Sequence, residues 1–207
     1  MNRAEDHLES ISRIRDIMER STTFVSLTGL SGVLAGVYGL ATFLVVASRL
    51  STVVLDRATL DRAALDRELL YFLIVVPLVA LIATLLTATV LTLRKARKKG
   101  LVVWDRASQR FALHLFLPLT AGGIFTLALI AQGQYQLVCA ALLMFFGLAL
   151  LNTSRFVKLD TFWLGTAEIV LGLVAAFQYE YGLILWGIGF GVATLVYGAL
   201  MYFKYER

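Results

Sequence analysis

The chain has 207 residues, of which 59% are hydrophobic and only 16% are charged. A soluble domain needs more polar surface than this to cover its core, so the composition excludes an ordinary soluble protein. The formal net charge at pH 7 is +5, and the mean hydropathy of the chain is +0.79.

Residues 1–23 form a charged segment that precedes the first apolar stretch. Leu8, Ile11, Ile14 and Met18 recur along one stripe at helical spacing, which predicts an amphipathic juxtamembrane helix. Such a helix can lie in the cytoplasmic membrane interface against its own bundle, or it can dock on a protein partner.

Six apolar stretches follow, and a membrane-spanning helix needs about 20 apolar residues. The sequence therefore predicts an all-α, polytopic membrane protein with a six-helix transmembrane domain over residues 24–207. We expect the spans at residues 24–47, 69–93, 111–131, 135–151, 162–177 and 182–203.

The basic residues predict how these spans are oriented. With six spans, fifteen of the 19 Lys and Arg residues fall on one side of the membrane and four on the other. The positive-inside rule then places both termini in the cytoplasm, and we expect a multi-pass protein of the bacterial inner membrane.

A Leu-Asp-Arg repeat, "LDRATLDRAALDRELL" at residues 55–70, connects the first two spans on the outer side. A period of five turns a helix by about 140° beyond one full turn, so the three leucines cannot share a face. Arg57–Asp61 and Arg62–Asp66 can pair at i,i+4. We interpret the repeat as a solvated, charged extension of the second span rather than a recognition element.

The connection after the second span, "RKARKKG", holds a cluster of cations that predicts contact with anionic lipid head groups. The positive-inside rule alone would also account for this cluster. A nucleic-acid site is not expected, because the patch lacks a folded domain and interleaved aromatic residues. The cations are Arg94, Lys95, Arg97, Lys98 and Lys99.

Small residues at four-residue spacing predict close helix packing in the first and sixth spans. The pairs are Gly32 with Gly36, and Gly187 with Gly191. Either pair could serve packing within the chain or formation of a homodimer.

Glu168, in "WLGTAEIVLG", is the one acidic residue well inside a predicted span. A charge deep in hydrocarbon costs at least about 2.5–3.5 kcal/mol, so such residues usually face the bundle interior. Glu168 could carry a proton, bind a cation or merely bond a neighbouring hydroxyl. Polar residues predicted for the same half of the membrane suggest a ligand-binding pocket open to the cytoplasm. Its candidate residues are Glu168, His114, Asn152, Arg155, Thr87 and Tyr197.

Signatures of catalysis and of cofactors are missing from the sequence. It contains no His-Glu-x-x-His or Cys-x-x-Cys spacing, no P-loop and no Gly-x-Ser-x-Gly. We therefore expect neither an enzyme nor a resident metal or cofactor.

Several stretches resemble a family of uncharacterised six-span integral membrane proteins of bacteria. They include "SLTGLSG" (26–32), "LLNTSRF" (150–156), "LGTAEIVLGL" (164–173) and "WGIGFG" (186–191). The resemblance covers most of the chain except the Leu-Asp-Arg repeat. It implies six spans and, for some members, a gene beside a winged-helix regulator, but no activity.

Two functions are compatible with the sequence. The first is a non-enzymatic sensor or scaffold in the lipid bilayer, motivated by the amphipathic helix and the basic connection, with a cytoplasmic protein partner. The alternative is a small-solute or ion transporter or channel, proton-linked through Glu168. A chain of 22.9 kDa would be expected to dimerise in order to transport.

Overall fold

A computed structural model describes residues 29–57, 67–98, 106–157 and 160–205, and within these ranges it contains helices but no strand. The long helices are α2 (Gly29–Arg57), α3 (Arg67–Lys98), α4 (Arg106–Ala131), α5 (Val138–Thr153) and α6 (Asp160–Phe177). Short turns η1 (Tyr135–Leu137) and η2 (Tyr179–Tyr181) precede α5 and the last span. That span joins α7 (Gly182–Trp186), η3 (Gly187–Ala193) and α8 (Thr194–Tyr205).

Six helical segments are long and apolar enough to cross a membrane, which confirms the predicted number of spans and the all-α class. They cover Gly29–Ser51, Glu68–Arg94, Ser108–Ala131, Tyr135–Thr153, Asp160–Phe177 and Tyr179–Lys204. The predicted juxtamembrane helix over 1–23, the start of the first span at residue 24 and the middle of the Leu-Asp-Arg repeat lie outside the described residues.

The ends of the spans differ from the prediction by a few residues. Helix α2 continues as far as Arg57, and the last span begins at Tyr179 rather than at Gly182. The last span is also not one regular α-helix, because η3 is a π-helix between α7 and α8. Hydropathy alone could not predict these features, since it reports the length of an apolar run and not its hydrogen-bond register.

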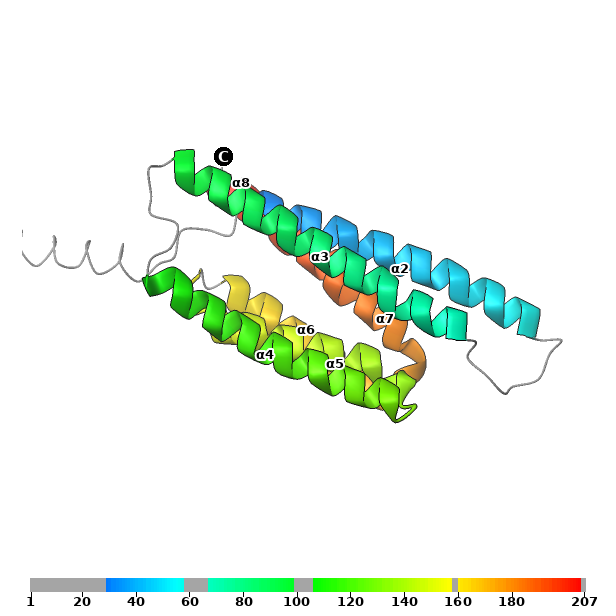
Figure 1. Cartoon of the computed structure of the whole chain (residues 1–207). Helices are drawn as coiled ribbons and strands as arrows, with labels where there is room; N and C mark the ends of the chain where they lie inside the picture. Colours follow the sequence, from blue (N-terminus) through cyan, green and yellow to red (C-terminus); the bar gives the residue numbers. More distant parts are fainter. Residues whose placement is uncertain (1–28, 58–66, 99–105, 158–159, 206–207) are drawn as a thin grey trace, which may run out of the picture.

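The helices form two groups that lie side by side (Figure 1). In one group α2 packs against α3, α8 and η3, and in the other α5 packs between α4 and α6. The two groups meet where α5 contacts α7 and where α6 contacts α7, η3 and α8. We call the end where α3 ends and α4 begins the basic end, because Arg94, Arg97, Arg110, Arg155 and Lys204 all belong to it.

Glycines permit the close packing of the first span against the last. A Cβ atom on Gly32 would lie 2.8 Å from the Cα of Gly198. A Cβ on Gly36 would lie 2.5 Å from the Cα of Leu195. Both glycines therefore let α8 approach the backbone of α2, as the small-residue spacing predicts.

The second glycine pair serves the same contact from the other side. Cβ atoms on Gly187 and Gly191 would each lie 2.6 Å from a side-chain carbon of α2, on Phe43 and Leu40 respectively. Both predicted glycine pairs thus lie in packing between helices of one chain.

The turn between α4 and α5 is set by Gly133, whose φ is +74°. Its N–H donates to the carbonyl of Ile130, and the N–H of Gln134 donates to the carbonyl of Leu129 at 2.8 Å. This is a Schellman ending, in which glycine adopts the left-handed conformation at no steric cost.

Candidate functional site

Glu168 lies on α6 and is 0% exposed. It follows the start of α6 at Asp160 by about 12 Å, at 1.5 Å per residue, and so lies near the middle of the span. Neither carboxyl oxygen has a hydrogen-bond partner among the described residues. Buried polar groups usually have a partner, so the two oxygens of this carboxyl call for a physical explanation.

The carboxyl group faces the π-helix of the last span. A Cβ on Gly189 would collide with Oε2 of Glu168 and would lie 2.6 Å from Cδ2 of Leu143. Glycine at position 189 therefore provides the space that the carboxyl group occupies. This contact joins α6 to η3 and lies where the two helix groups meet.

Thr194, at the start of α8, also lies close to the Glu168 carboxyl group. Its hydroxyl donates to the carbonyl oxygen of Gly189, at 3.1 Å. π-Helical turns are rare, and they occur frequently at functional sites because they displace one residue from the α register. The sequence singled out Glu168 but not Gly189 or Thr194, and the only signal was the alternation of glycines in "GIGFG".

His114 and Asn152 form a contact between α4 and α5. Asn152 Nδ2 donates to the backbone carbonyl of His114 at 2.9 Å, and Asn152 Oδ1 lies 3.2 Å from His114 Nδ1. Pro118 follows His114 by four residues and has no N–H, so it leaves this carbonyl without its helical partner. Asn152 supplies the missing donor, and its amide is thereby engaged at both ends.

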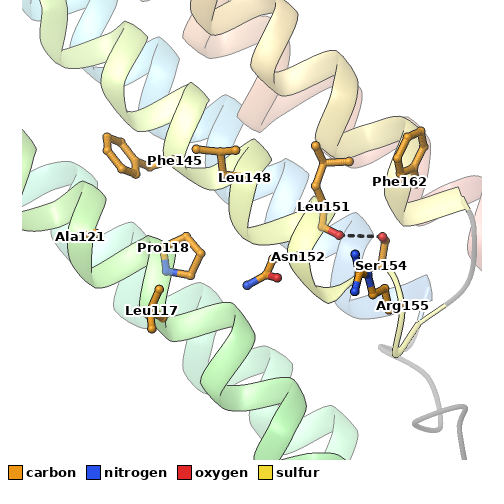
Figure 2. Close-up of a pocket in the computed structure, with 10 residues that line it drawn as sticks. All are labelled: Leu117, Pro118, Ala121, Phe145, Leu148, Leu151, Asn152, Ser154, Arg155 and Phe162. Carbon is orange, nitrogen blue, oxygen red and sulfur yellow. Dashed lines mark hydrogen bonds between the residues drawn. The ribbon is translucent and has the colours of Figure 1, made fainter.

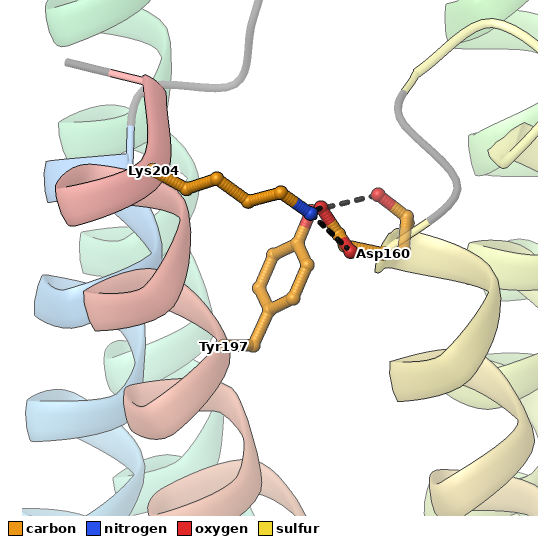
Figure 3. A network of polar contacts seen from close by, with 4 residues as sticks. Asp160, Tyr197 and Lys204 are labelled. Atoms are coloured by element: carbon orange, nitrogen blue, oxygen red, sulfur yellow. Dashed lines mark hydrogen bonds and ion pairs between the residues drawn. The ribbon is translucent and has the colours of Figure 1, made fainter.

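Tyr197 takes part in a separate polar contact at the basic end, between α8 and α6. Its hydroxyl lies 2.7 Å from Oγ1 of Thr161. Beside it, Lys204 Nζ donates to both carboxylate oxygens of Asp160, at 3.1 and 3.2 Å (Figure 3). The ion pair is largely exposed, so it contributes little to the stability of the fold.

Thr87 contacts the first span rather than any of the other candidates. Its Oγ1 donates to the carbonyl of Ala83 at 2.7 Å and lies 3.4 Å from the hydroxyl of Tyr38. This contact belongs to α2 and α3, in the other helix group from Asn152 and Arg155.

Asn152 and Arg155 line a cavity of about 730 Å³ beside α5 (Figure 2). Its walls come from α4, α5 and the start of α6, and most of them are apolar. The lining residues are Leu117, Pro118, Ala121, Phe145, Leu148, Leu151, Asn152, Ser154, Arg155 and Phe162.

The structure therefore distributes the six candidate residues over several places. It joins His114 to Asn152 and brings Asn152 together with Arg155 in the cavity, whereas Glu168 lies deep against η3. Thr87 and Tyr197 take part in other helix contacts. Position along each apolar run was readable from the sequence, but the rotation of each helix about its axis was not.

The cluster of cations lies at the end of α3. Arg94 and Arg97 are exposed there, and Lys95 and Lys98 belong to the same helix, while Lys99 lies outside the described residues. Their contact with lipid head groups stays a prediction. Over the described part of the chain, no three His, Cys, Asp or Glu side chains are grouped to hold a metal ion.

No family model, no curated protein and no solved structure matches the chain. Its resemblance to the six-span bacterial family therefore stays a prediction, and the functional argument depends on the geometry of the site.

Proposed function

We propose that the protein is a small-solute or ion transporter of the bacterial inner membrane in which Glu168 carries the coupled proton. The observation that supports this proposal is the full burial of Glu168 with both carboxyl oxygens unpartnered among the described residues. A charged carboxylate in such surroundings is costly, so a proton or a cation must accompany it.

The position of Glu168 supports coupling as well as binding. Many secondary transporters bind their ions near the bilayer midplane, between two groups of helices that move relative to each other. Glu168 lies near the middle of α6, against η3, where the two helix groups of this chain meet. Loss of the proton leaves a charge at this contact and favours a different packing of α6 against the last span.

Proteoliposomes that enclose a pH-sensitive dye test the proposal. Under imposed gradients of sodium, potassium or small metabolites, we expect wild-type protein to change the lumenal pH and Glu168→Gln to abolish the change. Gln keeps the size of the side chain and cannot release a proton. Glu180→Gln is the matched control, because Glu180 is exposed in the turn before α7.

Two results would contradict the proposal in different ways. An equal pH change in wild type and Glu168→Gln would remove the proton role of Glu168. A wild-type protein that moves neither protons nor any offered solute would remove transport itself. Thermal unfolding of each variant in the same detergent excludes misfolding as the cause of lost flux.

The second candidate function is a sensor or scaffold without enzymatic activity. It gains support from α3, which packs against α2 and has no buried residue between Glu68 and Arg94, so part of its surface faces lipid, a second copy or a partner. A pull-down that recovers only lipid and the protein itself would count against a cytoplasmic partner.

A further inference from the structure

The cavity beside α5 has the form of a groove that faces sideways out of the bundle. Its floor runs from Phe145 to Asn152 along α5, about 10 Å at 1.5 Å per residue. Leu117 on α4 and Leu148 on α5 are 63% and 43% exposed, so the groove faces the surroundings of the bundle. For a membrane-spanning helix those surroundings are lipid acyl chains.

The polar groups at the basic end of the groove are engaged, with one exception. Asn152 is bonded twice to His114, and the Ser154 hydroxyl donates to the carbonyl of Leu151 at 2.7 Å (Figure 2). Arg155 is exposed and forms no ion pair with another described residue. Its guanidinium group is therefore the donor that the groove can offer to a ligand.

This combination selects the chemistry of the occupant. An apolar groove at acyl-chain depth accepts a hydrocarbon chain. The Arg155 guanidinium group at its end, which pairs with no other described residue, matches a phosphate through its fork of donors. A soluble anion would gain no binding energy from the apolar floor of the groove. A zwitterionic lipid would oppose Arg155 with a cation of its own.

We propose that this groove is a binding site for an anionic phospholipid, with one acyl chain along α4 and α5 and the phosphate at Arg155. The site is independent of Glu168 and of the transport proposal. It also differs from the general attraction of the α3 cations to an anionic surface, because it requires both a groove and a charge.

Native mass spectrometry of the full-length protein tests the site with equimolar phosphatidylglycerol and phosphatidylcholine. We expect wild type to retain phosphatidylglycerol preferentially. Arg155→Gln should lower that preference about fivefold, which is the effect of one cation near a membrane surface. Leu148→Trp should fill the groove and reduce binding of both lipids.

Arg97→Gln is the matched control, since Arg97 is exposed at the same end but does not line the groove. An unchanged preference in Arg155→Gln, or an equal loss in Arg97→Gln, would overturn the proposal in favour of diffuse surface attraction. Competition by glycerol phosphate as effective as by the whole lipid would also overturn it, because the site would then bind a free anion. Arg155→Lys keeps the charge but not the fork of donors, so it should retain more of the preference than Arg155→Gln, which separates charge loss from misfolding.

Discussion

Asn152 illustrates how a single side chain makes a proline tolerable inside a span. Pro118 removes the N–H that would bond the carbonyl of His114, and no water in the bilayer core can replace it. Asn152 reaches from α5 to donate to that carbonyl and accepts from the His114 ring. The polar pair between α4 and α5 is thus explained by the backbone chemistry of α4.

We expect Asn152→Ala to lower the free energy of unfolding by about 1–2 kcal/mol, because it leaves a partly buried carbonyl and a ring nitrogen without partners. The same substitution should cost less in a Pro118→Ala background, where residue 118 regains the N–H that bonds His114. Unfolding by denaturant in one detergent gives the free energy of unfolding of wild type, the two single variants and the double variant.

Thr120→Ala controls for the loss of a polar group on α4, because among the described residues the Thr120 hydroxyl bonds to the carbonyl of Phe116 in its own helix and to no other helix. We expect little change from it. An identical cost of Asn152→Ala in both backgrounds would show that Pro118 and Asn152 act independently.

At the residue scale, the sequence identified Glu168 as an acid inside a predicted span but not the residues that surround it. Its depth followed from counting along an apolar run, whereas its contacts with Gly189 and Leu143 depend on helix rotation. The His114–Asn152 contact could have been anticipated, since the four-residue step from Pro118 back to His114 identifies the carbonyl in need of a donor. The helix that supplies this donor could not have been predicted from the sequence.

At the scale of elements, the helices were predictable because each apolar run is long enough to span. The π-helix was not predictable, because a change of hydrogen-bond register from i→i+4 to i→i+5 leaves no signature in hydropathy. Within η3, Gly187 and Gly191 serve the contact with α2 while Gly189 serves the contact with Glu168. One short segment therefore packs against both helix groups, and glycine is required on each side.

Substitution by alanine should have opposite effects on stability at two helical glycines, one at the contact between α2 and α8 and one on the surface of α4. Gly36→Ala should lower the free energy of unfolding by about 1–3 kcal/mol, since its Cβ would meet the backbone of Leu195. Gly123→Ala on α4 has nothing within 4 Å of the new Cβ, and should raise that free energy by about 0.5–1 kcal/mol.

Both substitutions add one methyl group to a helix, so each is the control for the other. Denaturant unfolding in the same detergent gives the two values. A neutral or stabilising Gly36→Ala would mean that the first and last spans do not pack as closely as described.

At the scale of the whole molecule, the contact between Glu168 on α6 and η3 matters because it lies where the two groups of helices meet. The helices α3 and α4 lie at the outside, whereas η3 and the middle of α6 lie where the two groups meet. Under the proposed transport function, a change in the charge of Glu168 would act on this contact. The groove at Arg155 lies on the outer side of the second group, away from this contact.

The orientation of the whole molecule determines which compartment each end faces. The distribution of Lys and Arg predicts that the basic end faces the cytoplasm. Cys139→Ala removes the one cysteine of the chain. In that background, the reaction of single introduced cysteines with a membrane-impermeant maleimide on spheroplasts shows which side of the membrane each position faces. Gln132, in the turn after α4, is exposed at one end of the bundle, and Arg97, near the end of α3, is exposed at the other.

We expect Gln132→Cys to react on intact spheroplasts and Arg97→Cys to react only after permeabilisation. The opposite pattern would invert the orientation and turn the Arg155 groove toward the outer leaflet. Labelling of both cysteines without permeabilisation would contradict the pairing of the spans, because an odd number of membrane crossings separates the two positions. The expected pattern would place the phosphate-binding end of the groove in the inner leaflet.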